Sequence, residues 1–139
     1  MTLELIPFGT MTAVLRRPLV LPGTPAGDRL IYEVESGHID GDRVRGKLKG
    51  HSGADWLIVG PEGTGTLDVR ALIETDDGAL VFIHYRGRVD VSQGPGAPLF
   101  AAPLFETGDD RYRWLNRIQT VGKGTLHGTT LSFELYELR

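Results

Sequence analysis

The sequence has no cysteine among its 139 residues. This absence excludes a disulfide scaffold, a thiolate nucleophile and any zinc or iron–sulfur site built on cysteine ligands. Long hydrophobic runs are also missing, because no apolar stretch approaches the roughly 20 residues that span a bilayer, and we expect no membrane contact. The opening residues, MTLELIPFGTM, lack a basic start followed by a long apolar run. They show no secretory signal, so we expect a cytoplasmic protein.

Positive charge is in short supply as well. Lys and Arg number 15 against 18 Asp and Glu residues, which gives a formal net charge of -3. A protein that binds nucleic acid by neutralising phosphates usually has a basic face and a high pI, so we expect no nucleic-acid partner.

Motifs for metal and nucleotide chemistry are absent too. The four histidines lie far apart and form neither HxH nor HExxH, which argues against a metal site. The glycine-rich strings GPEGTG and GKGT lack the GxxxxGK(S/T) spacing of a phosphate-binding loop. No GxSxG string occurs, and no serine has a base beside it that the sequence identifies. We therefore expect no metal and no cofactor.

Turn-forming residues, by contrast, are abundant. The chain has 19 glycines and 8 prolines, and they are scattered rather than clustered. Such spacing suits many strands joined by tight turns and favours an all-β fold. At this length the chain fits a single domain over residues 1–139, with enough core to need no covalent staples.

The clearest structural signal is a hairpin between Leu67 and Arg88. Two runs of strand-forming residues meet at a turn, residues 76–78, whose Gly78 suits a positive φ. A three-residue turn puts apolar residues opposite one another on one face: Ile73–Val81, Ala71–Ile83 and Val69–Tyr85. The other face then pairs Leu72–Phe82, Arg70–His84 and Asp68–Arg86. A two-residue turn would mix the faces, because one step of register inverts every side chain.

Shorter patterns predict the remaining elements. Strands are expected at residues 3–15 with an interruption at Pro7 and Gly9, and at 30–35, 56–59, 117–121 and 130–138. A second hairpin is expected at 38–49, loops at 16–28 and 87–103, and one or two helical turns within 105–116. About eight or nine strands with short turns predict a closed or nearly closed antiparallel β-barrel. A β-sandwich is the alternative, because strand spacing alone does not separate the two.

Six strings, in their order along the chain, resemble the DUF3237 family, also labelled UPF0311. They are LPGTPAGDR, HIDGDRVRGKLKG, SGADW, ETDDGA, FETGDDRYRWLN and the glycines of VGKG. The resemblance covers nearly the whole chain. It implies a small single-domain β-barrel, oligomeric in some members, with no established general activity. The departure lies at Val89–Pro103, which looks shorter than the family's loop and lacks its aromatic and basic residues.

The polar face of the hairpin supplies one candidate site. If this face lines the barrel lumen, Arg70 can hold a carboxylate or enolate oxygen, and Glu74 or Asp55 can act as a base whose pKa burial raises. His84 would contribute to ligand binding on the same face. The alternative is that this face meets water, where its charged pairs contribute little. Periodicity does not decide which face is inside.

Aromatic residues supply a second candidate. Trp56, Tyr112 and Trp114 stand near polar residues such as Asn116, a combination that suits a pocket for a flat or cyclic ligand. The alternative for each aromatic residue is core packing, because Trp and Tyr are highly buried in most folds.

One hypothesis and two alternatives follow. The protein binds a polar organic molecule in its barrel and acts on it by cofactor-free acid/base chemistry, such as isomerisation, cyclisation, hydration or elimination. The first alternative is a carrier or sensor that binds a ligand without catalysis. The second is an accessory protein whose lumen is filled by its own side chains and which associates through one sheet face. We expect a homo-oligomer.

Overall fold

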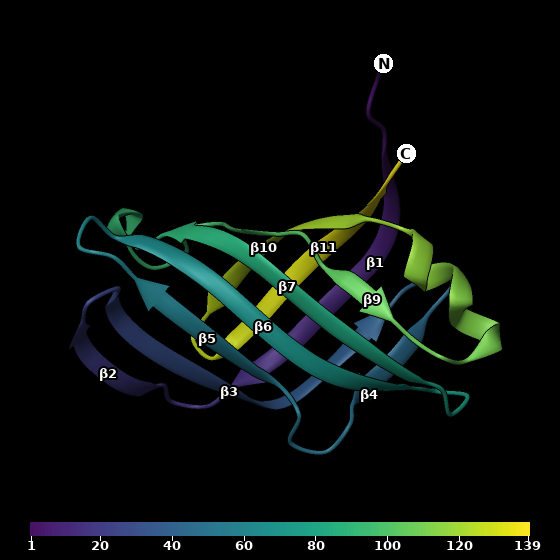
Figure 1. Ribbon diagram of the computed structural model, residues 1–139, viewed down its shortest axis with the longest axis horizontal. Helices are drawn as coiled ribbons and strands as arrows, with labels where there is room; N and C mark the ends of the chain where they lie inside the picture. Colours follow the sequence, from purple (N-terminus) through teal and green to yellow (C-terminus); the bar gives the residue numbers. More distant parts are fainter.

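Strands β6 (Thr64–Thr75) and β7 (Leu80–Asp90) form the longest hairpin of the barrel (Figure 1). In this computed structural model, which describes residues 1–139, all six predicted cross-strand pairs of the hairpin are present, from Ile73–Val81 to Asp68–Arg86. Gly78 has a φ of 90°, which the bulged turn requires and glycine adopts without strain. The hairpin prediction is therefore confirmed in both register and turn.

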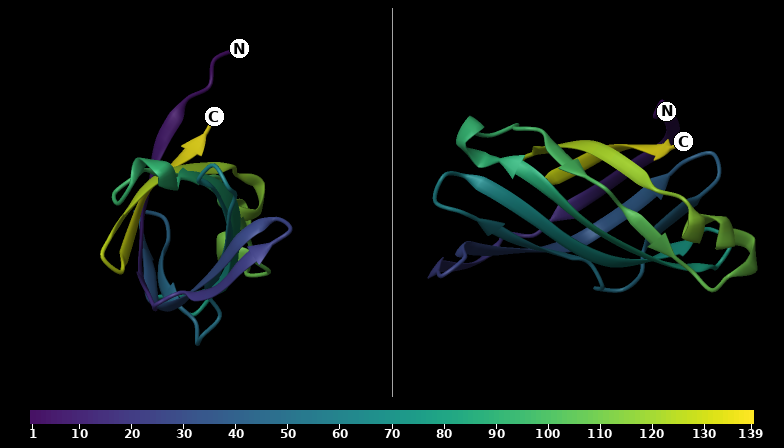
Figure 2. Two further views of the ribbon diagram at one scale, coloured as in Figure 1. Left: turned by 90° about the vertical axis from the view of Figure 1, so that its left-hand side faces the viewer. Right: turned by 45° about the horizontal axis from the view of Figure 1, so that its top comes forward.

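Eight strands close the barrel, each pairing antiparallel with two neighbours in the ring. Around the ring they are β1 (Leu5–Leu15), β3 (Gly27–Asp40), β5 (Ala54–Val59), β6, β7, β8 (Leu99–Ala101), β10 (Thr120–His127) and β11 (Thr130–Leu138). Strand β11 pairs back onto β1, so the first and last strands meet in one seam (Figure 2). The predicted closed antiparallel barrel is confirmed.

Three shorter strands extend this ring. They are β2 (Leu19–Thr24) on β3, β4 (Arg45–Leu48) between β3 and β6, and β9 (Leu104–Glu106) on β7. Strand β2 lies within the predicted loop 16–28 and contains Pro22. It pairs only with β3 and is an edge strand, which tolerates proline because one row of its backbone groups has no strand partner. Strand β3 joins the expected strand 30–35 to the start of the expected hairpin 38–49.

Glycines explain two further differences from the predicted strands. Strand β7 continues through Gly87 to Asp90, and β10 continues through Gly124 to His127. A Cβ on Gly87 would collide with the carbonyl oxygen of Phe100, and one on Gly124 would lie 2.8 Å from the ring of Phe133. These glycines allow a neighbouring strand or ring to approach closely, whereas the sequence predicted a loop from residue 87 and a strand that ends at residue 121.

A 3₁₀ helix, η2 (Asp110–Arg117), closes the right-hand end of the barrel in Figure 1. It confirms the helical turns expected within residues 105–116. The side chain of Asp109 caps it by accepting a hydrogen bond from the Arg111 N–H at 3.0 Å. Leu115 is fully buried, and the ring of Trp114 lies 6.3 Å from that of Phe8. This end of the lumen is therefore occupied by the protein's own side chains.

The wall of the barrel buries its apolar face inward. Phe133, Leu67, Leu135 and Val81 are among the largest fully buried side chains. They come from three strands, β6, β7 and β11, and belong to a single core that fills the middle of the ring. No helix in the structure combines the length and apolar character needed to cross a membrane.

Candidate functional site

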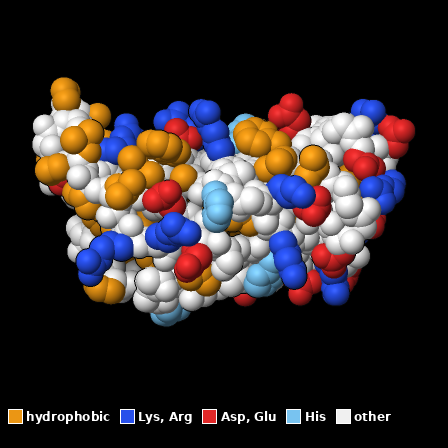
Figure 3. Space-filling model, turned by 90° about the horizontal axis from the view of Figure 1, so that it is seen from below, with side chains coloured by type: hydrophobic (Ala, Val, Ile, Leu, Met, Phe, Trp, Pro, Cys, Tyr) orange, Lys and Arg blue, Asp and Glu red, His pale blue; other side chains and the backbone are white.

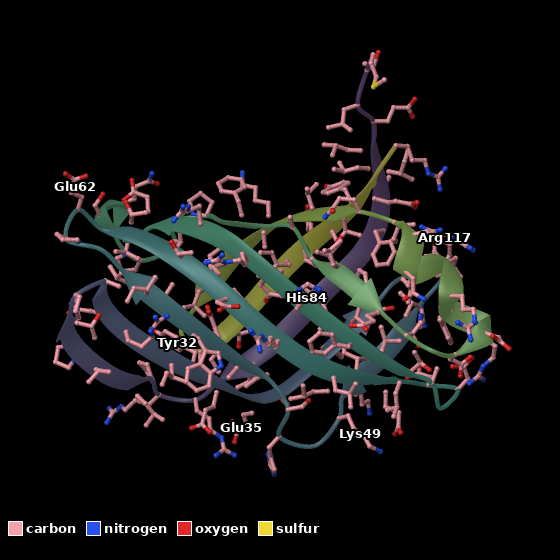
Figure 4. The ribbon with its side chains drawn as sticks, viewed as in Figure 1. Tyr32, Glu35, Lys49, Glu62, His84 and Arg117 are labelled. Atoms are coloured by element: carbon pink, nitrogen blue, oxygen red, sulfur yellow. The ribbon has the colours of Figure 1, made fainter.

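The polar face of the β6–β7 hairpin lies on the outside of the barrel. Arg70 and His84, the latter labelled in Figure 4, are exposed partners. The ring of His84 stacks on that of Phe82, with centroids 5.5 Å apart. Glu74 bonds the Lys49 ammonium at 2.9 Å, and its side chain is 44% exposed. The hypothesis that this face lines the lumen is wrong, because the ring buries the opposite, apolar face. Arg70, Glu74 and His84 therefore do not meet in a cavity.

The candidate aromatic residues are dispersed as well. Trp56 is 48% exposed and points outward from β5. The Tyr112 hydroxyl on η2 donates to Asp77 Oδ1 at 2.8 Å. Asn116 Nδ2 donates to the Thr107 carbonyl at 2.9 Å, and its Oδ1 accepts from the Thr107 N–H. With Trp114 packed on Phe8, the three η2 residues hold the closed end together and form no pocket with Trp56.

Asp55 is the predicted site residue that faces the lumen. Along β5, Asp55 and the buried Leu57 point inward, while the exposed Trp56 between them points outward. The pairings of four adjacent strands place Tyr32 opposite Asp55, Asp55 opposite Val69, and Val69 opposite Tyr85. We call these four residues the inner row. They form a line across the inside of the wall.

The Asp55 carboxylate takes part in the sheet itself. Pairing between β5 and β6 is interrupted between Asp55–Val69 and Ile58–Thr66. In this gap the backbone N–H of Asp68 donates to Asp55 Oδ1 at 3.0 Å. The bond holds the side chain against the wall and occupies one oxygen. Every side-chain nitrogen or oxygen that is fully buried has a hydrogen-bond partner. The second oxygen of Asp55 has no such partner, so it is accessible from the cavity that Asp55 lines.

The surroundings of Asp55 favour its uncharged form. Burial raises the pKa of Asp55 to about 6, although the Asp68 N–H lowers it, and the charge of the Asp68 carboxylate adds to the rise. Burial, and then the charge of Asp55, raise the pKa of both Tyr32 and Tyr85. The two phenols are therefore protonated at neutral pH and can donate hydrogen bonds. A carboxyl whose pKa is raised to about 6, in one row with two protonated phenols, suits proton transfer.

A cavity of about 510 Å³ lies in front of Asp55, a size within the usual range for small-molecule sites. We call it the mouth cavity. Its wall combines Tyr32, Asp55, Leu57 and Leu67 with residues of the segment 91–97 and of the β10–β11 turn. The segment begins with a short 3₁₀ helix, η1 (Val91–Gln93), capped by Asp90. This turn and segment form the end of the barrel opposite η2 (Figure 1).

A second cavity of about 70 Å³ is lined by residues of β1, β3, β4, β6, β7 and β11. We call it the inner cavity. Of its 14 lining residues 11 are hydrophobic, and they include Val69 and Tyr85 of the inner row. Leu131 lines both cavities. The inner row therefore marks the boundary between a roomy mouth cavity and a small apolar compartment.

Sequence reasoning missed Tyr32, Tyr85 and both cavities. A usable signal was present, because both tyrosines occur at otherwise aliphatic positions of strongly alternating strands. A phenol in such a row brings a polar group into the lumen. The structure brings together no group of three His, Cys, Asp or Glu side chains that could hold a metal ion.

The chain is similar in sequence to known proteins and in fold to solved structures. A UPF0311 protein from Rhodopseudomonas palustris (strain TIE-1) is 27% identical over 128 residues, covering 81% of each chain. A UPF0311 protein from Bradyrhizobium diazoefficiens is also 27% identical and covers 93% of this chain and 92% of its own. A β-barrel-like protein from Acinetobacter baumannii superposes with a TM-score of 0.89 at 28% identity, covering 100% of this chain and 98% of its own.

A more distant structure, described as an enzyme from Penicillium herquei, has a TM-score of 0.70 at 22% identity, covering 99% of this chain and 94% of its own. At that identity the likeness concerns the fold alone. The family described as "Protein of unknown function (DUF3237)" matches residues 3–138 of the sequence. The chain is therefore a member of the DUF3237 family, as its sequence strings suggested.

Proposed function

We propose that this protein binds a small organic molecule in the mouth cavity and that Asp55 transfers a proton to or from it without a cofactor. The observation that carries the proposal is the free oxygen of Asp55. It belongs to the one charged side chain in the wall of a 510 Å³ cavity. A carboxylate in apolar surroundings is a stronger base than one in water, because burial disfavours its charge.

The chemistry follows from the inner row. At neutral pH the ionised Asp55 removes a proton from a C–H or O–H group of the bound molecule. The Tyr32 hydroxyl, which belongs to the same wall, stabilises the oxygen that becomes negative by donating a hydrogen bond. Asp55 then returns the proton to another atom. The sequence of steps describes an isomerisation, a cyclisation or an elimination followed by addition.

A general probe of proton abstraction tests this role before the natural substrate is known. The ring of 5-nitrobenzisoxazole opens when a base removes its C3 proton and the N–O bond breaks, which leaves a coloured cyanophenolate. We expect the rate to rise as pH increases through about 6, because the ionised form of Asp55 is the base. Asp55→Asn should lose about 100-fold or more of this rate, a typical contribution of a positioned base.

Glu74→Gln is the matched control. It also removes a carboxylate from the barrel wall, but on the outer face, where Glu74 pairs with Lys49. The control should keep the rate and the pH profile of the parent protein. Equal rates for Asp55→Asn and the parent protein would contradict the catalytic role.

A carrier is the second candidate function, and the apolar wall favours it. Ten of the 15 residues around the mouth cavity are hydrophobic, so a ligand can be held there by burial alone. In that case Asp55→Asn would leave the probe reaction unchanged while ligand binding persists.

A further inference from the structure

The charge of the lumen limits what can enter it. Around the mouth cavity the wall contains no Lys, Arg or His, and Asp55 is its one acidic residue. Around the inner cavity the basic residue is His38, which is exposed and sits at an outward position of β3 opposite Lys47. An anion in the lumen would therefore lose its hydration without meeting a positive partner, and it would face the charge of Asp55.

A cationic ligand fits the wall poorly for a different reason. An ammonium group carries three N–H donors, and each needs an acceptor once water is excluded. Asp55 Oδ1 already accepts the Asp68 N–H, which leaves one carboxylate oxygen and the tyrosine hydroxyls. A hydroxyl or carbonyl group needs fewer partners. Its requirements match one free carboxylate oxygen and one phenol.

The inner cavity adds a constraint on shape. It begins at Val69 and Tyr85 of the inner row and continues between aliphatic side chains such as Ala71, Ile73 and Val34. A volume of about 70 Å³ has room for a compact alkyl group but for no polar group that needs partners.

From these features we propose that the lumen binds an uncharged molecule, with a hydroxyl or carbonyl oxygen at Asp55 and a compact apolar group in the inner cavity. This inference rests on the part of the proposed function that concerns ligand binding in the mouth cavity. It is independent of whether Asp55 transfers a proton. Amphipathic neutral compounds are selected, and carboxylates, phosphates and phosphate esters are rejected.

Four benzene derivatives test the inference by isothermal titration calorimetry at pH 8, where Asp55 is ionised. They are 4-tert-butylbenzyl alcohol, 4-tert-butylbenzoate, 4-tert-butylbenzylammonium and plain benzyl alcohol. We expect the tert-butyl alcohol to bind at least about ten-fold more tightly than the benzoate, which meets no positive partner, and than the ammonium compound, whose N–H donors outnumber the acceptors in the lumen. It should also bind at least about ten-fold more tightly than benzyl alcohol, which lacks the buried alkyl group.

Two variants locate the apolar subsite. Ala71→Leu fills the inner cavity and should reduce the advantage of the tert-butyl alcohol over benzyl alcohol to about three-fold or less. Ala54→Leu makes the same exchange on the outer side of β5, opposite the exposed Arg70, and should leave the advantage intact. The comparison between the two alcohols in the parent protein needs no variant, so it holds even if Ala71→Leu fails to fold.

Three outcomes would overturn the inference. They are tighter binding of the benzoate or the ammonium compound than of the alcohol, equal binding of the two alcohols, and no binding of any compound at millimolar concentration. Each can be told apart from failure of the catalytic proposal. Selective binding of the tert-butyl alcohol, together with an unchanged probe reaction in Asp55→Asn, would leave the ligand class standing and remove only the catalytic role.

Discussion

At the scale of single residues, the ionised Asp55 side chain lowers the stability of the fold but supplies a group for binding or catalysis. It is a carboxylate on an inward position, where the other members of the inner row are an aliphatic residue and two phenols. Residues of this kind are kept in lumens for binding or catalysis rather than for stability, because the charged form loses hydration there.

Burial of Asp55 predicts how the free energy of unfolding depends on pH. The folded pKa of about 6 lies above the ordinary value of 3.8, so between these two values the folded protein binds more protons than the unfolded chain. Its free energy of unfolding therefore falls as pH rises through this window and stays low above it. Asp55→Asn should be more stable than the parent protein at pH 8, by up to about 3 kcal/mol, and the gain should vanish near pH 4.

Urea unfolding at pH 4 and pH 8 measures this difference. Asparagine keeps an oxygen that can accept the Asp68 N–H, so the sheet contact survives the change. Glu74→Gln serves as the control and should show no such gain at pH 8. If Asp55→Asn were no more stable than the parent protein at pH 8, Asp55 would not be desolvated in the lumen.

At the scale of elements, the closed end depends on a contact among η2, β11 and the β3–β4 turn. Arg43 lies over the ring of Trp114, 4.4 Å from its centroid, and donates to Glu137 Oε2 at 2.6 Å. The Glu137 side chain is 8% exposed and also accepts from Arg139. These contacts join three separate parts of the chain across one end of the barrel.

Removing the guanidinium should loosen this end. We expect Arg43→Met to lower the free energy of unfolding by about 1–2 kcal/mol, because Glu137 loses its shorter hydrogen bond and Trp114 its cation. Arg45→Met is the matched control, since Arg45 pairs with Asp40 where both side chains are more than half exposed. It should cost less than about 0.5 kcal/mol. Chemical denaturation of both variants, followed by Trp fluorescence, compares them directly, and equal costs would count against a joining role for Arg43.

The glycines of β10 give a second prediction at this scale. A Cβ on Gly124 would lie 2.8 Å from two ring atoms of the buried Phe133, whereas one on Gly108 would meet nothing within 4 Å. Gly124→Ala should therefore destabilise the fold by about 1–3 kcal/mol through overpacking. Gly108→Ala should change stability by less than about 0.5 kcal/mol. Thermal unfolding separates the two, and an equally stable Gly124→Ala would mean that Phe133 can move aside.

At the scale of the whole molecule, closure of the barrel determines which face of each strand is buried, and local sequence patterns do not. The β6–β7 register followed from turn chemistry and alternation, because both are local. Which face of that hairpin is inside depends on the other strands of the ring, and sequence alternation is the same for either choice. For this reason Asp55 could be proposed as a base from the sequence, while its separation from Arg70 and Glu74 could not be foreseen. The loop expected from residue 87 and the strand end expected at residue 121 were wrong for a similar reason, since the roles of Gly87 and Gly124 depend on their contacts with Phe100 of β8 and Phe133 of β11.

The outer surface bears on the expected homo-oligomer, which stays a prediction. Leu19, Val20 and Leu21 of the edge strand β2 are 56–60% exposed. In Figure 3 apolar side chains gather toward the left-hand end of the face shown, and charged side chains dominate the right-hand end. Edge strands with exposed apolar side chains tend to pair with further strands. A second copy of the chain offers the same edge strand.

Light scattering across a range of protein concentrations measures the assembly. We expect the parent protein to be a homo-oligomer and Val20→Lys to shift it toward the monomer, because a charge on an edge strand opposes strand pairing. Leu104→Lys, on β9 and 38% exposed, adds the same charge to another part of the outer wall and should leave the assembly unchanged. A parent protein that is monomeric at every concentration would contradict the prediction. Equal dissociation by both lysines would show that the effect of Val20→Lys is not specific to β2, and no dissociation by Val20→Lys would place the interface away from β2.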